Sequence, residues 1–325
     1  MKIHMLQGPP LSDLARALDI FEEQFSYPLG PDSTFRISHG DDYTRFFRAM
    51  GEAVVFVAEN DGQVLGTVAA ALRSLMTPDG HEKNAVYLGD VKISPAARRG
   101  LTPLRLMRAL LAEAAHRSRI EGIFSVLMDG TELPQTPEAY SRRAARLGLP
   151  VLRAVGHITI LRVPTSQLTD ATTQDGDPAR SVSLAAVAEL YRRLTQGHYA
   201  VPAGQPMMRS ELPPAALMLS DDSACGLLED TRRAKLLYTA AGELRGAHLS
   251  NFAYRDPERG AALVKAALSL AAKHGNPELT FAIPVPDTAA LVAHLCIPGT
   301  GVYQATVNGA DLAAAERWSI NTAEI

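Results

Sequence analysis

The sequence predicts an α/β (α+β) fold made of two similar units. Apolar runs typical of strands alternate with amphipathic runs typical of helices, and one strand pair surrounds the turn Asn60-Asp61-Gly62. The order of elements is repeated after a polar stretch in the middle of the chain. At 325 residues, the chain is long enough for two domains.

The hairpin is the clearest local signal in the first half. Two β-rich runs, 53–59 and 63–72, are joined by an Asp-Gly turn, which favours the positive φ angles of tight hairpins. The other elements expected in this half are strands at 2–6, 87–93, 123–128 and 158–163 and helices at 11–25, 43–50, 103–115 and 137–147.

A polar, Thr- and Asp-rich stretch without periodicity separates the halves at residues 164–181. We therefore expect a first domain at 1–163, a linker at 164–181 and a second domain at 182–325. The elements expected in the second domain are helices at 184–194, 257–274 and 287–295 and strands at 225–229, 235–239, 243–251, 279–283 and 302–307.

Composition narrows the classes of function. The formal net charge of -3 argues against a protein that binds nucleic acid, because such proteins usually carry a basic excess. The only cysteines, Cys225 and Cys296, lie far apart without metal-ligand spacing, so we expect buried free thiols and no metal site. No run resembles a signal peptide or a membrane span, and we expect a cytoplasmic protein without a membrane partner.

The stretch from Tyr87 to Ala115 carries the strongest functional signal. A strand ends at Ser94-Pro95, and the loop Arg98-Arg99-Gly100-Leu101-Thr102 then leads into an amphipathic helix with Pro103 in its first turn. The unpaired N–H groups and positive dipole end of this helix would face the loop arginines, an arrangement suited to phosphate or diphosphate. The alternative is an ordinary strand-loop-helix joint with solvated arginines.

This hairpin, strand, loop and helix together resemble the GCN5-related N-acetyltransferase (GNAT) family over residues 53–163. The family has a strand ending in Val-x-Pro, followed by Arg-x-x-Gly-x-Gly or Ala at the start of a helix. Ile93-Ser94-Pro95 fits the first part. Without a gap, Arg98 takes the arginine place and the glycine places are lost, whereas a shift of one residue puts Gly100 and Thr102 in the glycine places.

The resemblance implies a tandem pair of such domains, each with a mixed, mostly antiparallel central sheet flanked by helices. The second domain looks like a degenerate copy, because Asp256 and Glu258 near its helix start would compete with a phosphate. The resemblance also implies acetyl-CoA or another acyl-CoA as the acyl donor, and an amine of a small molecule or peptide as the acceptor. The assembly state is left open, with a homodimer among the alternatives.

Each step of acyl transfer receives candidate residues from the resemblance. The donor diphosphate would bind at the loop and the first helical turn, and backbone N–H groups of the central strand would hold the thioester oxygen. The candidates for donor binding are Val91, Ile93, Arg98, Arg99, Gly100, Leu101, Thr102 and Arg105. The candidate base is Asp90. The candidate acid for the leaving thiolate is Tyr140, one helical turn before the usual position, which Ala144 occupies.

Each of these catalytic candidates has a structural alternative. Asp90 could instead pair with Lys92 or another cation at the surface, and Tyr140 could be a packed aromatic residue. Residues 39–43, with a histidine, two aspartates and a tyrosine, would lie in the loop covering the acceptor, but a solvated polar loop explains them better. The phenylalanines of the first helices are better explained by core packing than by an acyl pocket.

Three functions follow from these patterns. The leading interpretation is an acyl-CoA-dependent N-acyltransferase, most simply an acetyltransferase. The first alternative is a catalytically silent binding or assembly module, which the degenerate loop and the missing tyrosine favour. The second alternative is a long-chain acyltransferase that takes its acyl group from coenzyme A or an acyl carrier protein, because the loop is poor in glycine.

Overall fold

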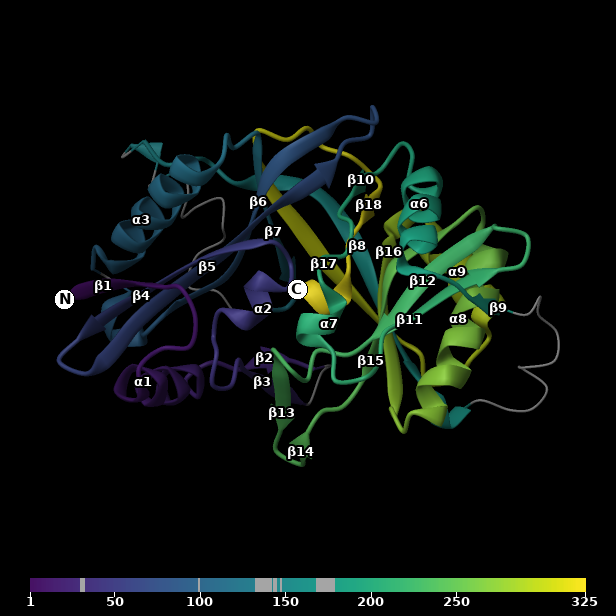
Figure 1. The fold of residues 1–325 in the computed structure, drawn as a ribbon, viewed down its shortest axis with the longest axis horizontal. Helices are drawn as coiled ribbons and strands as arrows, with labels where there is room; N and C mark the ends of the chain where they lie inside the picture. Colours follow the sequence, from purple (N-terminus) through teal and green to yellow (C-terminus); the bar gives the residue numbers. More distant parts are fainter. Residues whose placement is uncertain (30–32, 99, 132–141, 143–144, 147, 168–178) are drawn as a thin grey trace.

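A continuous 14-stranded sheet runs through the whole molecule, and helices cover both of its faces (Figure 1). The structure is a computed structural model that describes residues 1–29, 33–98, 100–131, 142, 145–146, 148–167 and 179–325. A smaller, 4-stranded sheet lies below the middle of the large one in this view. The predicted class, a mixed sheet flanked by helices, is confirmed.

Most of the helices and strands of the first half lie where the sequence predicts them. The strands are β1 (Lys2–Leu6), β2 (Tyr27–Pro28), β3 (Thr34–Ser38), β4 (Glu52–Asn60), β5 (Gln63–Met76), β6 (Glu82–Ile93), β7 (Gly122–Met128) and β8 (Arg153–Pro164). The helices are α1 (Ser12–Glu22), α2 (Arg45–Arg48) and α3 (Thr102–Arg117), with a 3₁₀ turn η1 (Pro95–Ala97) before α3.

The second half has a similar content of strands and helices. After the turn η2 (Thr165–Gln167), its strands are β9 (Ala179–Ser181), β10 (Tyr199–Ala200), β11 (Ala215–Leu219), β12 (Ala224–Glu229), β13 (Leu236–Thr239), β14 (Gly242–Glu243), β15 (Ala247–Tyr254), β16 (Glu278–Pro284), β17 (Gly301–Ala310) and β18 (Trp318–Ser319). The helices are α6 (Leu184–Leu194), α7 (Pro206–Arg209), α8 (Pro257–Lys273) and α9 (Thr288–Leu295), with turns η3 (Val285–Asp287) and η4 (Thr322–Glu324).

The large sheet has the same pairing pattern when it is followed outward from its centre. Its order is β1-β4-β5-β6-β7-β17-β8-β16-β15-β12-β11-β9, with β10 and β18 beside this path. β17 and β8 pair antiparallel in the middle, and each side then has an antiparallel pair followed by a parallel pair. Strand β17 of the second half thus completes the sheet of the first, and β8 of the first half completes that of the second. The sequence-based division does not anticipate this exchange.

Helices cover the two faces in the same way in both halves. In the first half, α3 packs on the face that carries Val54 and Val68, whereas α1 and α2 pack on the face that carries Val55 and Ala69. Neighbouring residues of a strand point to opposite faces, so apolar runs without alternation are expected for strands covered on both sides. In the second half, α8 and α6 cover opposite faces of β12 and β15.

The predicted hairpin is present as β4 and β5, which pair antiparallel. Asp61 and Gly62 both have positive φ angles, 50° and 80°, as a tight two-residue turn requires. The predicted helix at 137–147 falls mostly outside the described residues. Six short strands, β2, β3, β9, β10, β11 and β18, are absent from the sequence-based prediction, because strands of at most 5 residues leave little periodic signal.

The predicted linker is only partly described. Its described residues form η2 and β9, and β9 pairs with β11 at the far edge of the sheet. The division into domains at this stretch stays a prediction. The expectation of two buried thiols is half wrong, since Cys225 is buried but Cys296 is exposed at the end of α9, with a φ angle of 52°. In the described part of the chain, no helix is both long and apolar enough to span a bilayer.

Candidate active site

The parallel strands β6 and β7 separate soon after they pair. Their pairing covers only residues 85–87 and 122–124, whereas β6 continues to Ile93 and β7 to Met128. The far ends of the two strands therefore diverge, and their backbone groups are available to other partners. Val91 and Ile93, the predicted contacts of the thioester group, lie on the diverging end of β6.

A β-bulge turns the backbone of β6 at Asp90. The register with β5 shifts between Thr67 and Ala69, and Asp90 has a positive φ angle of 48°. Aspartate tolerates this left-handed conformation better than most residues. The Thr67 hydroxyl donates to the Asp90 carbonyl oxygen at 3.1 Å and holds the bulge in place. The bulge directs the Asp90 carboxylate toward residues from α1 and the loop before α2.

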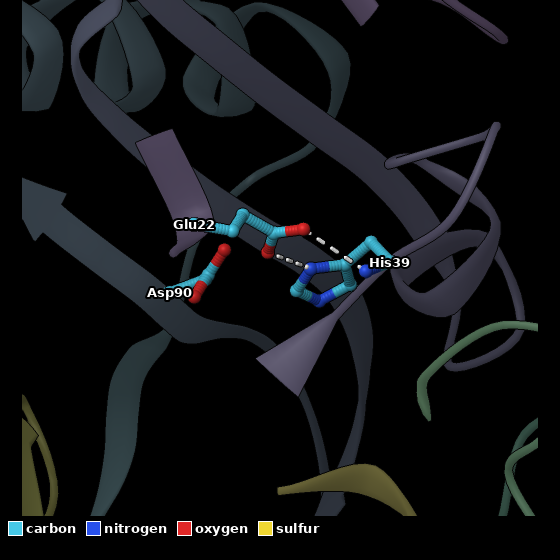
Figure 2. Close-up of side chains that lie close together, drawn as sticks. All are labelled: Glu22, His39 and Asp90. Atoms are coloured by element: carbon cyan, nitrogen blue, oxygen red, sulfur yellow. Dashed lines mark hydrogen bonds and ion pairs between the residues drawn. The ribbon is translucent and has the colours of Figure 1, made fainter. Parts of the chain in front are cut away.

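The Asp90 carboxylate belongs to a buried charge cluster with Glu22, His39, Tyr43 and Lys92. Figure 2 shows Glu22, His39 and Asp90 converging from separate segments. The Lys92 ammonium lies 2.7 Å from Asp90 Oδ1 and 3.1 Å from Glu22 Oε1. Glu22 also contacts His39 Nδ1 at 2.6 Å and accepts from the His39 backbone N–H at 3.0 Å. The Tyr43 hydroxyl donates to Asp90. Asp90 is thus paired with Lys92, as the structural alternative expects, but inside the protein.

The pKa values in the charge cluster favour its ionised form. Burial raises the pKa of the Asp90 carboxyl, but the charges of Lys92 and His39 outweigh burial and lower it overall. The same balance, with His39 and Lys92 opposing burial, lowers the pKa of Glu22. Burial and the Asp90 charge raise the pKa of Tyr43, so its hydroxyl stays protonated and donates. A carboxylate with a lowered pKa has little affinity for a proton, so Asp90 is a weak base at neutral pH.

Three members of the charge cluster also have the chemistry of metal ligands. Single ligand atoms of Glu22, His39 and Asp90 all lie within 4.8 Å of one another. The Lys92 ammonium, however, contacts both carboxylates and already supplies a positive charge between them. We therefore describe this group as an ion-pair cluster.

The start of α3 lies over the opposite face of the sheet from the charge cluster. Leu101 is the N-cap residue, and its side chain has no polar atom that could cap the helix. There is open space beside Gly100, since a Cβ placed on this residue would meet only the Ala97 backbone oxygen, at 3.5 Å. Arg98 and Arg105 are both exposed, and Arg98 Nε donates to the Ile93 carbonyl oxygen at 3.3 Å. The Gly100 N–H donates to the Ala97 carbonyl oxygen at 3.2 Å, but the N–H groups of Leu101 and Thr102, the positive helix end and two arginines form a suitable site for an anion such as a diphosphate.

The equivalent helix of the second half, α8, has a protein carboxylate in this place. Asp256 is the N-cap residue, and its side chain accepts from the Arg259 backbone N–H at 3.0 Å. Glu258 adds a second acidic side chain in the first turn. The sequence-based expectation of carboxylates at this helix start is confirmed.

The gap between the strands of the second half is bridged by the protein itself. β15 and β16 pair only at residues 247–248 and 279–280 and then diverge, and Asn251 is a bulge residue with a φ angle of 46°. Asn321 Oδ1 accepts from the Asn251 backbone N–H at 2.8 Å. The Thr322 hydroxyl donates to the Thr280 carbonyl of β16 at 3.1 Å. The segment around η4 therefore fills the gap between β15 and β16, which is equivalent to the gap between β6 and β7 in the first half.

A cavity of about 220 Å³ lies between the halves, beside the charge cluster. The end of β7 that pairs with β17 but no longer with β6 forms part of its wall, together with residues of β3, β13 and β17. Tyr27 lines the cavity, and its hydroxyl interacts with Lys92, so the cavity is connected to the charge cluster. Lys235 also lines it, with Nζ 4.4 Å from the centre of the Phe46 ring and a hydrogen bond to the Ile325 backbone oxygen.

The predicted donor residues are only partly gathered at the start of α3. Val91 and Leu101 are exposed, with 46% and 61% of their surface accessible. Thr102 is buried, and its hydroxyl contacts the Met1 sulfur at 3.4 Å. Arg99 and Tyr140 lie outside the described residues. The roles of these residues in donor binding and catalysis stay predictions.

Three residues of the charge cluster are missing from the sequence-based site. The expectation of a solvated loop at residues 39–43 is wrong for His39, Asp42 and Tyr43, since only 4%, 1% and 2% of their surface is exposed. Glu22 lies on the last turn of α1, with 4% exposed. The one sequence signal for this group is Lys92, two residues after Asp90 on an apolar strand, because a buried cation requires an acidic partner.

Comparison with known proteins identifies the fold. No protein-family model and no curated protein matches the sequence. Saccharomyces cerevisiae N-myristoyltransferase with bound myristoyl-CoA has a TM-score of 0.61 at 11% identity, over 99% of this chain and 87% of that chain. A GCN5-related N-acetyltransferase from Anabaena variabilis has a TM-score of 0.52 at 14% identity, over 95% of this chain and 72% of that chain. The chain therefore has the GNAT fold in a two-domain arrangement.

Proposed function

We propose that the protein is an N-acyltransferase that takes an acyl group from acyl-CoA and transfers it to a primary amine. The observation that carries this proposal is the uncapped start of α3 beside Arg98 and Gly100, in the same half as the diverging ends of β6 and β7. An anion site and an opening between strands are what a long donor with a diphosphate at one end requires. The fold shared with solved N-acyltransferases supports the proposal.

In this proposal the donor passes from the α3 face to the face of the charge cluster. Its diphosphate accepts from the N–H groups of Leu101 and Thr102 and from Arg98 and Arg105, with Gly100 leaving room beside them and Arg99 as a further contact. N–H groups at Val91 and Ile93 stabilise the negative charge that develops on the thioester oxygen. A fixed hydrogen-bond donor of this kind stabilises the transition state by about 3 kcal/mol.

Asp90 and Tyr140 are the residues proposed for proton transfer. Asp90 lies near the proposed thioester position, but Lys92 and Tyr43 engage its carboxylate. Its lowered pKa suits a residue that fixes the backbone beside Val91, and removal of a proton through water is its secondary role. Tyr140 stays proposed as the acid for the leaving thiolate, which leaves readily even without an acid.

Acetyl-CoA is the proposed donor. A long-chain acyl-CoA is the second candidate, favoured by the myristoyl-CoA that is bound in the yeast N-myristoyltransferase structure. A catalytically silent module is the third candidate and predicts donor binding without release of coenzyme A. A small-molecule amine is the proposed acceptor, because the cavity between the halves is small and partly enclosed by both of them.

Calorimetric titration with acetyl-CoA tests the proposal directly. Changing Arg98 and Arg99 together to Ala should weaken binding by about tenfold or more, since each charge-assisted hydrogen bond is worth about 1.5–3 kcal/mol. Arg255→Ala is the matched control, because this exposed arginine occupies the equivalent loop of the second half. Unchanged affinity in the double variant removes the donor site from α3. Binding without thiol release across a panel of amines supports the silent module instead.

A further inference from the structure

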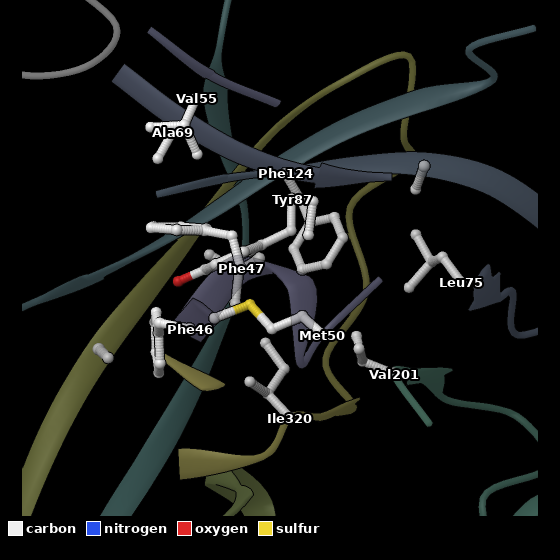
Figure 3. Close-up of a cluster of buried hydrophobic side chains, with 14 of the residues drawn as sticks. Phe46, Phe47, Met50, Val55, Ala69, Leu75, Tyr87, Phe124, Val201 and Ile320 are labelled. Atoms are coloured by element: carbon white, nitrogen blue, oxygen red, sulfur yellow. The ribbon is translucent and has the colours of Figure 1, made fainter. Parts of the chain in front are cut away.

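Space on the α2 face of β6 is filled next to the proposed thioester position. Gly89 precedes the bulge, and a Cβ placed there would lie 3.1 Å from the Phe47 ring and 3.2 Å from the Tyr87 ring. Figure 3 shows Phe47 packed among Phe46, Met50 and Tyr87. Only 1% of Phe47 is exposed. A short acyl group fits beside this packed surface better than a long one, so the neighbouring cavity is left for the acceptor.

The cavity between the halves has mostly apolar walls. Apolar side chains come from the first half, as with Phe35, Ile37 and Val126, and from the second, as with Leu237 and Tyr303. A dry cavity of about 150 Å³ holds benzene in another protein. The cavity here, at about 220 Å³, therefore has room for one aromatic or short aliphatic group.

The charges around the cavity disfavour a second positive charge. Two arginines of its wall already form ion pairs with glutamates. The nitrogen-to-oxygen distance is 2.6 Å for Arg162 and Glu278 and 2.7 Å for Arg232 and Glu243. Burial together with the Arg209 charge lowers the pKa of Lys235, on the same wall, to about 7. Burial and the Lys235 charge lower the pKa of His248, on the same wall, to about 3. The surroundings that oppose protonation of these groups also oppose a bound ammonium.

Building on the proposed function, we propose that the acceptor is a primary amine with an uncharged, apolar body about the size of one aromatic side chain. The cavity between the halves binds this body, and Tyr27 lies where the cavity meets the charge cluster. Amines with a second ammonium group, such as polyamines, are excluded, because the apolar walls would desolvate that charge and the glutamates of the wall are already paired with arginines.

A matched pair of amines tests the charge requirement. Hexylamine and cadaverine have nearly the same length, but cadaverine carries a second ammonium group at the end where hexylamine has a methyl group. With acetyl-CoA as donor, kcat/KM should be at least about tenfold higher for hexylamine and phenethylamine than for cadaverine. Equal or higher kcat/KM for cadaverine overturns the inference.

Variants of Leu237 test the location. Leu237→Trp should raise the KM for hexylamine about tenfold by filling the cavity, with little change in the KM for acetyl-CoA. Leu237→Ala should shift the preference toward larger amines. Tyr238→Trp is the control, because Tyr238 lies on the same strand and does not line the cavity. A change in the preferred acyl chain length, rather than in the KM for the amine, assigns the cavity to the acyl group and overturns the inference.

Binding measurements separate this inference from the proposed function. Calorimetric titration of hexylamine into the protein with coenzyme A present reports on the cavity even where no amine is acylated. Hexylamine binding that Leu237→Trp abolishes, without any thiol release, supports the cavity assignment and overturns the proposed transferase activity. Thiol release with amines that is insensitive to both Leu237 variants supports the activity and overturns the cavity assignment.

Discussion

The two halves of the sheet have the same order of pairing and differ at the gap between their parallel strands. In the first half, β6 and β7 diverge, and the helix start nearby has no capping side chain. In the second half, β15 and β16 diverge in the same way, but Asn321 and Thr322 bridge them and Asp256 caps the helix. One set of pairings therefore supports two outcomes, a candidate ligand site and a closed structural unit.

The difference between the halves indicates that a ligand site at this position lowers stability. An N-cap carboxylate and hydrogen bonds across the gap each stabilise the second half, the cap alone by about 1 kcal/mol. The first half lacks the cap, and its free N–H groups remain available to an anion. This is the expected trade between stability and function at one structural position.

The bulge residues extend the comparison to charge. Asp90 and Asn251 occupy equivalent bulges, with φ angles of 48° and 46°. Asn251 is neutral, and neutral Asn321 holds its backbone. Asp90 is charged and requires Lys92, which in turn lies against Glu22. The bulge residue itself is therefore charged only in the half that carries the candidate site, although the second half has its own buried ion pairs between Arg209, Glu229 and Glu324.

Lys92→Met should have the largest effect on stability. It leaves the Asp90 and Glu22 carboxylates buried without the ammonium, and breaking a buried pair in this way costs about 3–5 kcal/mol. Asn321→Ala removes the bridge to Asn251 and the hydrogen bonds that the Asn321 amide donates to Val201 and Glu324, and should cost only about 1–3 kcal/mol, because it leaves no ion pair broken. Urea unfolding of both variants measures the two values. Equal losses would mean that charge does not distinguish the two bulges.

The pH dependence of stability should change sign in the same variant. In the natural protein Asp90 and Glu22 have lowered pKa values, so they add stability above the unfolded-state pKa of about 4, and this stability is lost as the pH falls through their folded values. Without Lys92, burial should raise the pKa of Asp90, which loses its largest opposing charge, whereas His39 still opposes burial at Glu22. Lys92→Met should therefore gain stability as the pH falls from about 7 to about 4. Urea unfolding midpoints measured across this range report the stability of both proteins. If lowering the pH reduced the midpoint of Lys92→Met as it does that of the natural protein, the assigned ion pair would be contradicted.

Leu101→Asp gives α3 the cap that α8 already has. The new carboxylate should stabilise the helix by about 0.5–1 kcal/mol and weaken acetyl-CoA binding about tenfold, because it occupies the N–H groups and repels the diphosphate. Leu101→Asn is the matched control, since it caps the helix without adding a charge, and it should weaken binding less. Thermal unfolding and calorimetric titration give both quantities. Tighter binding in Leu101→Asp would separate donor binding from the start of α3.

Local signals account for much of the fold and less of the site. The hairpin around Asp61 and Gly62 and the long helices follow from turn chemistry and periodicity, which act over a few residues. The insertion of β17 beside β7 joins segments far apart in the chain, and no local pattern reports such a pairing. The charge cluster is hidden for the same reason, because the buried His39 is paired with Glu22, which lies on another element. From sequence alone, a polar residue without an identifiable partner is predicted to be exposed to solvent.

Asp256→Ala should have the smallest effect and tests the comparison from the other side. Removal of the cap from α8 should cost about 1 kcal/mol of stability. It should not create a second donor site, because Asn321 and Thr322 still bridge β15 and β16. Calorimetric titration of the variant should therefore give the same acetyl-CoA stoichiometry as the natural protein. A doubled stoichiometry would show that the helix cap alone prevents acetyl-CoA binding in the second half, and that the bridge between β15 and β16 does not.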